Sequence, residues 1–349
     1  MKIKMKYKKP KKIKKKEGKL IIFSRNINYF IIILIVLIIL FLAKKIIGVN
    51  NLRNSPWELR KNIYTIKVNN SKKPYYSCFC SMGKKENLYI RELISYYINL
   101  GVDKFVLGDN NLPNVEKFSD VLQDYIKNGT VDILDIIGKV YDHAEYFDIL
   151  YQKYKYKCSW LTFFDLDEYL VLFSEEGKKI KINDFLSNKK FDNCLSVSFN
   201  WLMYDDNDLV YYDNRTSIER FTRPDNQNKY NRFVKSIIRG GIEGTVFPKN
   251  GSCHMPLKYI SQCNPMGKKM SNSDTLSPPM YKYGYIMHFN TRTADEYTKK
   301  MIRGYPPNKF YKVTDRVNLF FYHNKYTEEK LKIFEKVFNR TFQVSPRKK

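Results

Sequence analysis

Short apolar stretches alternate with amphipathic stretches from residue 75 onward. In Glu86–Leu100 apolar residues recur every three or four positions and Gly101 follows, which predicts a helix that stops at a glycine. Two further stretches, 115–127 and 143–155, are also predicted helices. The apolar stretches around them have the length of strands: Tyr75–Ser81, Lys104–Leu107, Val131–Leu134 and Trp160–Phe164. Strands that alternate with helices of about 10–15 residues predict βαβ units and a parallel sheet.

The pattern changes after residue 175, where strand-like segments predominate. The predicted strands of this part are Leu195–Phe199, Leu209–Tyr212, Phe233–Ile238 and Tyr285–Phe289. Two helices are expected at the C-terminal end. We therefore expect residues 73–349 to form one α/β domain with a mostly parallel sheet flanked by helices.

The N-terminal part has a lysine tract in its first 20 residues and then a charge-free apolar run, Tyr29–Ala43. This run is shorter than the roughly 17–25 residues of a spanning helix, but lysines near helix ends can snorkel, so residues 27–49 can cross a lipid bilayer. A cleaved signal peptide has the same basic-then-apolar order and is the alternative. An anchor with its positive side in the cytosol predicts a tail over 1–26, a stem over 50–72 and a single-pass protein whose catalytic domain lies across the membrane.

The net charge of the chain gives only a weak indication of the class of ligand. The formal net charge is +27, and residues 1–61 account for +15 of it. The basic remainder suits an acidic ligand such as a nucleotide diphosphate, although a solvated basic surface is the more common explanation. The chain has no zinc-finger spacing, recognition-helix signature or RNA-binding aromatic motif, so nucleic acid is not an expected partner.

The cysteines and sequons bear on the compartment. No C-x2-C pair occurs among the six cysteines, so a zinc site is not expected. Cys253 and Cys263 can close a short disulfide loop in an oxidising compartment, or both can be buried thiols. Five N-x-S/T sequons fit a secretory lumen, although several would arise by chance in a chain rich in asparagine. They begin at Asn69, Asn128, Asn214, Asn250 and Asn339.

Three carboxylates follow the fourth predicted strand directly: Asp165, Asp167 and Glu168. Acids cannot be buried unpaired, so they require a metal ion, a basic partner or water. An Asp-x-Asp beyond a buried strand suits Mg2+ or Mn2+, which keep several waters and bridge to phosphates. A solvated turn is the alternative for an isolated Asp-x-Asp. Ligands of open parallel sheets bind at the carboxyl ends of the strands, which predicts that 81–85, 109–111 and 165–168 meet at one edge.

Several blocks occur in a fixed order along the chain: Lys84–Asn87, Leu100–Phe105, Asp109–Asn110, Trp160–Tyr169, Phe199–Trp201, Glu219–Phe221, Lys235–Arg239, His288–Phe289 and Lys300–Gly304. In these blocks the chain resembles glycosyltransferase family 92 and its bacterial relatives over residues 75–305. Two departures occur. The first block has Lys-Glu-Asn where Asn-Glu is usual, and the loop 203–208 is acidic where relatives carry a Gly/Ser-rich turn.

The resemblance implies a Rossmann-like GT-A fold and a cation, Mn2+ or Mg2+, held by Asp167 and Asp165. Asp165 is also implied to hold the ribose or a metal-bound water, and His288 to be a further ligand; a core histidine is the alternative. Nucleotide contacts are implied for Lys85, Glu86 and Asp109, where turn capping is the alternative for Asp109. The cations expected at the diphosphate are Lys235, Arg239, Lys300 and Arg303.

The family resembles inverting enzymes, which need a carboxylate to deprotonate the acceptor hydroxyl. The candidates are Asp205, Asp206 and Glu243, and the sequence does not choose between them. Trp201 is either a sugar-stacking platform or a core residue. The expected reaction moves a sugar, with galactose as one option, from a UDP-sugar to a glycan acceptor, in the Golgi lumen if the source is eukaryotic. The alternative is a membrane-tethered, catalytically inactive glycan- or nucleotide-binding protein of the same fold.

Overall fold

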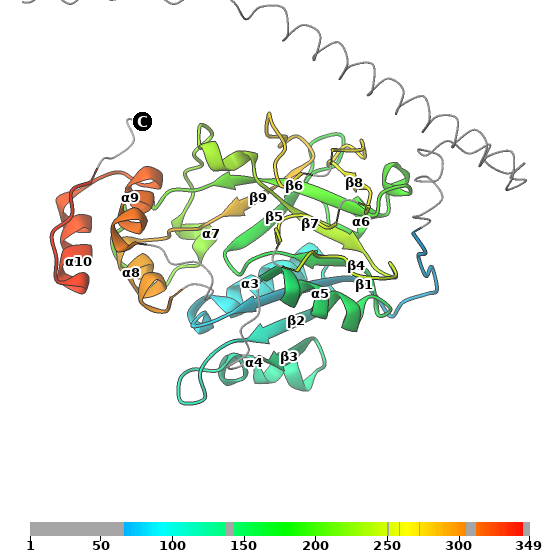
Figure 1. Cartoon of the computed structure of the whole chain (residues 1–349), viewed down its shortest axis with the longest axis horizontal. Helices are drawn as coiled ribbons and strands as arrows, with labels where there is room; N and C mark the ends of the chain where they lie inside the picture. Colours follow the sequence, from blue (N-terminus) through cyan, green and yellow to red (C-terminus); the bar gives the residue numbers. More distant parts are fainter. Residues whose placement is uncertain are drawn as a thin grey trace, which may run out of the picture. The chain divides into compact units, whose positions relative to one another are not determined.

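The computed structural model describes residues 66–136, 143–249, 251–257, 259–271, 273–304 and 312–344. These residues belong to one compact unit, and its central sheet is shown in Figure 1. The strands are β1 (Tyr75–Gly83), β2 (Lys104–Asp109), β3 (Val131–Asp135), β4 (Cys158–Phe163), β5 (Glu168–Leu172), β6 (Ser196–Met203), β7 (Val234–Arg239), β8 (Gln262–Cys263) and β9 (Gly284–His288).

The helices of the first half alternate with the strands, as predicted. The α-helices are α3 (Asn87–Leu100), α4 (Phe118–Lys127), α5 (His143–Tyr154), α6 (Ile182–Leu186), α7 (Ser217–Arg220), α8 (Ala294–Ile302), α9 (Val313–His323) and α10 (Glu328–Phe338). Two 3-10 turns, η1 (Lys189–Phe191) and η2 (Lys229–Arg232), complete the described elements. Gly101 ends α3 in the left-handed conformation with a φ of 98°, which confirms the predicted glycine stop.

The sheet is mixed, where a mostly parallel one was expected. Its order is β3-β2-β1-β4-β7-β6-β9-β5, and β8 pairs with β6. The βαβ units make β1 to β4 parallel, whereas β7 runs antiparallel to both β4 and β6, and β5 runs antiparallel to β9. As a result β4, β6 and β9 all end at the same edge, and β7 and β5 begin there. Because β1, β2 and β3 run parallel to β4, they end at this edge too, so strands from both halves of the chain bring side chains to it.

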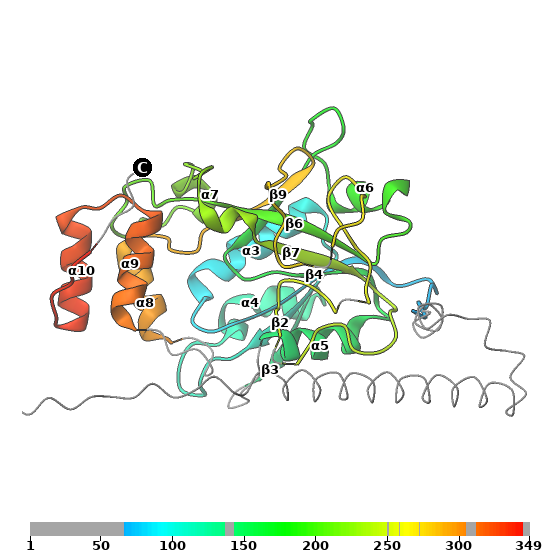
Figure 2. The ribbon, with the colours of Figure 1, turned by 45° about the horizontal axis from the view of Figure 1, so that its top comes forward.

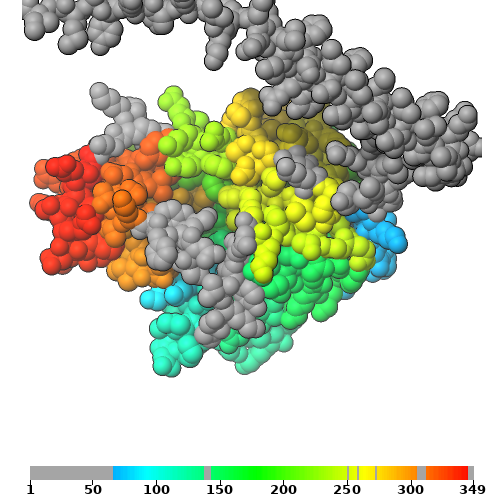
Figure 3. All heavy atoms as spheres, in the orientation of Figure 1, coloured from blue at the N-terminus to red at the C-terminus, as the bar shows by residue number. Residues whose placement is uncertain are grey.

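Apolar side chains cover both faces of the sheet because neighbouring residues of a strand point to opposite sides. On β1, Phe79 packs in the cluster that includes α3, α4 and α6, and Cys80 packs in the cluster that includes α5. The second cluster also contains residues from Ile242 to Ile260. Figure 3 shows the yellow part of the chain that contains them beside the green part that contains α5.

Helices α8, α9 and α10 stand together at one end of the described unit (Figure 2). Their own apolar cluster includes Tyr297, Phe320 and Phe334. Thr293 begins α8 by a capping box with Glu296, so the chain turns sharply between β9 and α8. The C-terminal part thus has three helices beyond β9 where two were expected.

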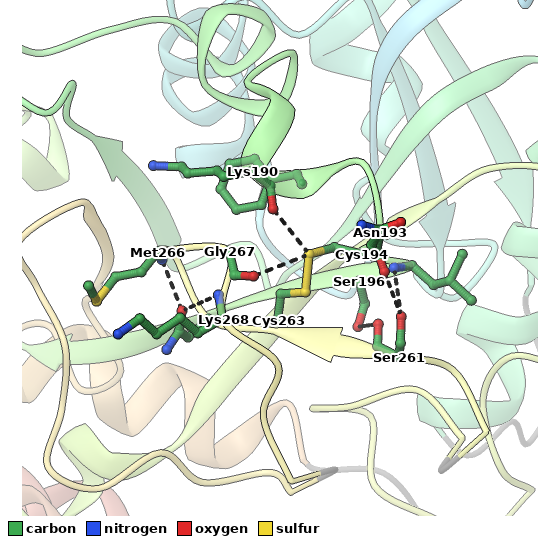
Figure 4. The surroundings of a disulfide bond; sticks show 12 residues. Lys190, Asn193, Cys194, Ser196, Ser261, Cys263, Met266, Gly267 and Lys268 are labelled. Atoms are coloured by element: carbon green, nitrogen blue, oxygen red, sulfur yellow. Dashed lines mark hydrogen bonds between the residues drawn. A yellow bond between two sulfur atoms is a disulfide. The ribbon is translucent and has the colours of Figure 1, made fainter.

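One local prediction is wrong, one strand was not predicted, and one alternative for the cysteines is excluded. The expected strand Leu209–Tyr212 is a loop, and Val210 uses its carbonyl to accept from the amide of Asp295. Strand β5 was missed, because the chain turns straight back after Asp167. Of the two alternatives for Cys253 and Cys263, a disulfide between them is excluded because Cys263 bonds to Cys194; a second disulfide joins Cys78 to Cys158. Figure 4 shows the Cys194–Cys263 bond, with Ser196 and Ser261 beside it.

The predicted tail, anchor and most of the stem, residues 1–65, lie outside the described residues. None of the helices in the described ranges is both long and apolar enough to cross a membrane.

Candidate functional site

The centre of the site is the short turn Asp165-Leu166-Asp167 between β4 and β5. The end of β1 approaches this turn closely. A Cβ atom on Gly83 would lie 2.3 Å from Cδ1 of Leu166, so only a glycine fits there without a shift of Leu166. The Ser81 hydroxyl donates to the Phe164 carbonyl at 2.7 Å, and the Lys85 amide donates to Asn111 Oδ1. Segments 81–85, 109–111 and 165–168 therefore meet at one edge, as predicted.

Lys235, at the start of β7, neutralises the first carboxylate of the turn. Its Nζ lies 2.8 Å from Oδ2 of Asp165 and 3.6 Å from Oε1 of Glu168, and the lysine side chain is fully buried. Glu168 is fully buried as well, and its Oε2 accepts from the Asp165 amide at 3.1 Å. Lys235 thus ties β7 to both ends of the acidic turn, and the Asp165 side chain keeps 34% of its surface exposed.

The second carboxylate is held by residues from the C-terminal part. Lys300 Nζ of α8 lies 2.7 Å from Oδ2 of Asp167 and also donates to the carbonyl of Asn290. His288 Nε2 lies 3.6 Å from Oδ1 of Asp167, because Glu168 of β5 is paired with His288 of β9. One carboxylate oxygen of Asp167 thus binds the ammonium group of Lys300, and the other faces the imidazole ring of His288.

Burial and the charges of these partners together set the pKa values of the three acids. Burial opposes the charge of Asp165, but Lys235 and His143 outweigh it and keep its pKa below the usual value. Burial opposes the charge of Asp167 as well, and Lys300 and His288 bring its pKa well below the usual range. Burial instead raises the pKa of Glu168 well above its ordinary value, which favours the neutral acid. The site therefore presents two carboxylates that stay ionised at neutral pH.

Aromatic rings line the side of the site beyond His288. The Trp201 ring lies between two imidazoles, with its centroid 4.3 Å from that of His288 and 5.0 Å from that of His254. Among the described residues, neither Trp201 Nε1 nor His288 Nδ1 has a hydrogen-bond partner, and both atoms are buried. The Trp201 side chain is partly buried.

Glu86 anchors a basic group on the other side of Asp167. Arg292 Nη1 lies 3.1 Å from Oε2 of Glu86, and Arg303 Nη1 donates to Oε1. Arg303 also donates to the Lys84 carbonyl, which joins α8 to the loop that follows β1. Glu86 therefore positions two guanidinium groups.

The donor atoms of this site fit a partly hydrated cation. No three His, Cys, Asp or Glu side chains within the described ranges already form a group that could hold a metal ion. Asp165 and Asp167 each give one oxygen to a lysine, which leaves a second oxygen on each. The 3.6 Å between Asp167 Oδ1 and His288 Nε2 is somewhat longer than the roughly 3.0 Å between adjacent ligands of an octahedral cation bound at about 2.1 Å, so a small side-chain movement would let both bind one ion. Mg2+ or Mn2+ completes such a shell with water and phosphate oxygens.

Two predicted site residues, Arg239 and Glu243, lie near the start of β4, at the end of the strands opposite the site. Arg239 is paired with Trp160, five residues and so about 16 Å along the chain from Asp165. It donates to the carbonyls of Phe191 and Cys194. Glu243 binds Tyr156, just before β4. The strand β7 runs away from the site, so neither the predicted diphosphate role of Arg239 nor the predicted base role of Glu243 fits this placement.

Asp109 caps a turn, the alternative considered for it. Its Oδ1 accepts from the amide of Asn111 and its Oδ2 from the amide of Phe118 at the start of α4. With both oxygens used by the backbone, Asp109 fixes the loop and does not offer a free acceptor to a nucleotide.

The two remaining base candidates follow β6 and form structural ion pairs. Both oxygens of Asp205 accept from Arg223 Nε at 2.8 Å. Asp206 lies 2.6 Å from Lys330 of α10, and both side chains are fully buried. Burial raises the pKa of Asp206 to about 6. The enclosed Asp206 is paired with Lys330 and offers no exposed carboxylate to an acceptor hydroxyl, so its predicted role as base does not fit this placement.

Sequence reasoning missed Arg292, Asn290 and the pairing of Lys235 with Glu168. One signal was available for Arg292. The sequence Thr293-Ala-Asp-Glu296 is a capping box, which predicts a helix start and places the preceding arginine in the turn after the His288 strand.

The structure thus has an α/β domain with an acidic, lysine-paired group at the carboxyl ends of its strands, and comparison by sequence adds a family resemblance. The model of glycosyltransferase family 92 matches residues 73–241, which confirms the predicted resemblance. Over these residues the chain is similar to the glycosyltransferases of that family. His288, Arg292, Lys300 and Arg303 lie beyond the matched residues. No curated protein matches the chain.

Solved structures of TarS from S. aureus are similar at low identity. TarS 1-349 in complex with UDP-GlcNAc has 11% identity and a TM-score of 0.36, over 76% of this chain and 72% of that chain. A structure of S. aureus TarS has 12% identity and a TM-score of 0.27, over 40% of this chain and only 23% of that chain. The matched part thus spans about a quarter of that TarS chain, and at these TM-scores the likeness carries no argument about function.

Proposed function

We propose that residues 73–349 form a metal-dependent, inverting GT-A glycosyltransferase that moves a sugar from a UDP-sugar to a glycan acceptor. The observation that carries the proposal is the convergence of Asp165, Asp167, His288 and Lys300 at the carboxyl ends of β4 and β9. The family match supports sugar transfer as the reaction. Cation, donor nucleotide and stereochemistry are the parts that go beyond this support.

Asp165, Asp167 and His288 are the residues that would hold Mn2+ or Mg2+. A bound divalent cation would balance the charge of a diphosphate leaving group. The protein's own contribution is positioning. Lys235 fixes Asp165, and Lys300 fixes Asp167. Of the two lysines, Lys300 is the one that can reach a phosphate oxygen, because its side chain is 17% exposed whereas that of Lys235 is fully buried.

We also propose that residues 27–49 anchor the protein and that the domain works in an oxidising lumen. The basic leader supports this orientation. Two disulfides and the exposure of Asn69, Asn128, Asn214 and Asn339 are compatible with a secretory lumen. Protease added to sealed microsomes should trim the tail alone. Digestion of the whole domain, or a mature protein that begins after residue 45, would show that the anchor is wrong.

The reaction is tested with the full chain purified in detergent. It is incubated with Mn2+ and, in turn, with UDP- and GDP-linked sugars, and release of the nucleoside diphosphate is measured with and without glycan acceptors. Release from a UDP-sugar that EDTA abolishes is the expected result. No release from any nucleotide-sugar, with or without acceptor, would overturn the assignment as an active transferase and favour the inactive binding protein.

A further inference from the structure

We infer that Arg292 is a further anion-binding residue of this site and takes an oxygen of the donor's diphosphate. The inference rests on the proposed function and extends it to a residue outside the family match. Arg292 occupies the turn between β9 and α8, four residues after His288 and one before the helix cap Thr293.

The backbone of Arg292 is held in an unfavourable conformation. Its φ is 51°, in the left-handed region that costs a residue with a Cβ about 1–2 kcal/mol. Its neighbours enforce this conformation. Thr293 is fixed by the capping box of α8, and Thr291 accepts a hydrogen bond from Asn324 at 3.0 Å. Strain that neighbours maintain in this way is typical of functional turns.

The guanidinium group of Arg292 is buried with donors left over. The residue is 7% exposed, its Cζ lies 3.4 Å from the centroid of the Tyr89 ring, and Nη1 donates to Glu86. In the described part of the chain, neither Nε nor Nη2 has a hydrogen-bond partner, and both atoms are buried. A buried donor without a partner typically costs about 1–3 kcal/mol, so such donors call for a missing ligand or water.

Arg220 shows that this arrangement is not general in the protein. It is also fully buried, yet its Nη1 and Nη2 both bind Glu296, and its Nε donates to the Arg215 carbonyl. The incompletely bonded arginine is the one beside the acidic turn, where it contributes to the low pKa of Asp167.

The local charge balance favours an anion. Glu86 is shared by Arg292 and Arg303, so one of the two positive charges is not neutralised by it. Asp167, the next acid, is already bound by Lys300. A doubly negative diphosphate between Arg292 and Lys300 would satisfy the spare donors of the guanidinium fork.

The test is equilibrium binding of UDP and of uridine, in the presence of Mn2+, to the full chain and to Arg292→Gln. Uridine has the base and ribose but no phosphate. Arg292→Gln should weaken the binding of UDP by about 10- to 100-fold and leave that of uridine unchanged. Arg292→Lys keeps the charge without the fork and should lie between the two. Arg91→Gln, on an exposed face of α3, is the matched control for loss of a positive charge.

Each outcome decides a separate point. If the unsubstituted chain does not bind UDP, the proposed function fails. If it binds UDP and Arg292→Gln binds it within about twofold, or loses uridine by the same factor, Arg292 is a structural residue and the inference is overturned. If Arg292→Gln does not fold, Arg292→Lys decides: a loss for UDP alone supports the inference, and unchanged affinity overturns it.

Discussion

Two aspartate pairs follow buried strands at the same edge of the sheet, and their surroundings differ completely. Asp165 and Asp167 follow β4, and Asp205 and Asp206 follow β6. The first pair gives one oxygen of each carboxylate to a lysine and keeps a second oxygen. In the second pair both oxygens of Asp205 bind Arg223, and Asp206 is sealed against Lys330. Both pairs follow a strand, so this position does not distinguish a binding site from a structural ion pair. The distinction lies in the side chains that bind the carboxylates.

The largest expected effect concerns the structural pair. Lys330→Met should lower the free energy of unfolding by about 3–5 kcal/mol, because it leaves Asp206 buried without its partner. Urea unfolding at neutral pH measures the change. The double variant Asp206→Asn, Lys330→Met should recover most of the loss, since no unpaired charge remains. A loss below about 1 kcal/mol in the single variant would contradict the structural role.

Asp167→Asn is the matching change in the other pair, and it should act on turnover instead of stability. Loss of one such electrostatic contact costs about 2.7–4 kcal/mol of barrier, or 10²–10³ in rate. The asparagine keeps the shape, so the melting temperature should change little. Sugar transfer from the donor found in the screen measures the effect. Undiminished turnover, in this variant or in EDTA, would contradict the proposed cation site.

The difference between the pairs also shows what a sequence can tell. The first four strands and the meeting of three segments at one edge follow from local apolar patterns and the geometry of βαβ units. The partners do not, because Lys235 lies 70 residues and Lys300 lies 133 residues from the aspartate that each one binds. Such pairs depend on the order of the strands, and the antiparallel β7 and β5 were not predictable from periodicity. The same reversal carries Arg239 away from the site.

His288 is expected to have a smaller effect, confined to the cation. A ligand role requires a ring nitrogen near Asp167, and the 3.6 Å separation meets this requirement. His288→Gln should raise the Mn2+ concentration needed for half-maximal turnover by about 10-fold or more, since even outer-shell partners of a metal change its affinity by 10- to 100-fold. Reduced stability with unchanged Mn2+ dependence would identify a core histidine. His323→Gln, which changes a buried histidine bonded to Asn228, controls for loss of an imidazole.

The smallest effect is expected for Asp205, the acid of the second pair whose partner is solvent-exposed. Arg223 has 47% of its side chain exposed, so the ion pair should contribute only about 0–1 kcal/mol to stability. Asparagine can still accept from the Asn207 amide, which Asp205 Oδ1 does in the native turn. Asp205→Asn should therefore change turnover by less than about threefold, a barrier change well under 1 kcal/mol. A loss of turnover of a hundredfold or more at unchanged melting temperature would instead show that Asp205 deprotonates the acceptor. In that case Arg223 would orient a catalytic base, and the contrast between the two aspartate pairs would apply to Asp206 alone.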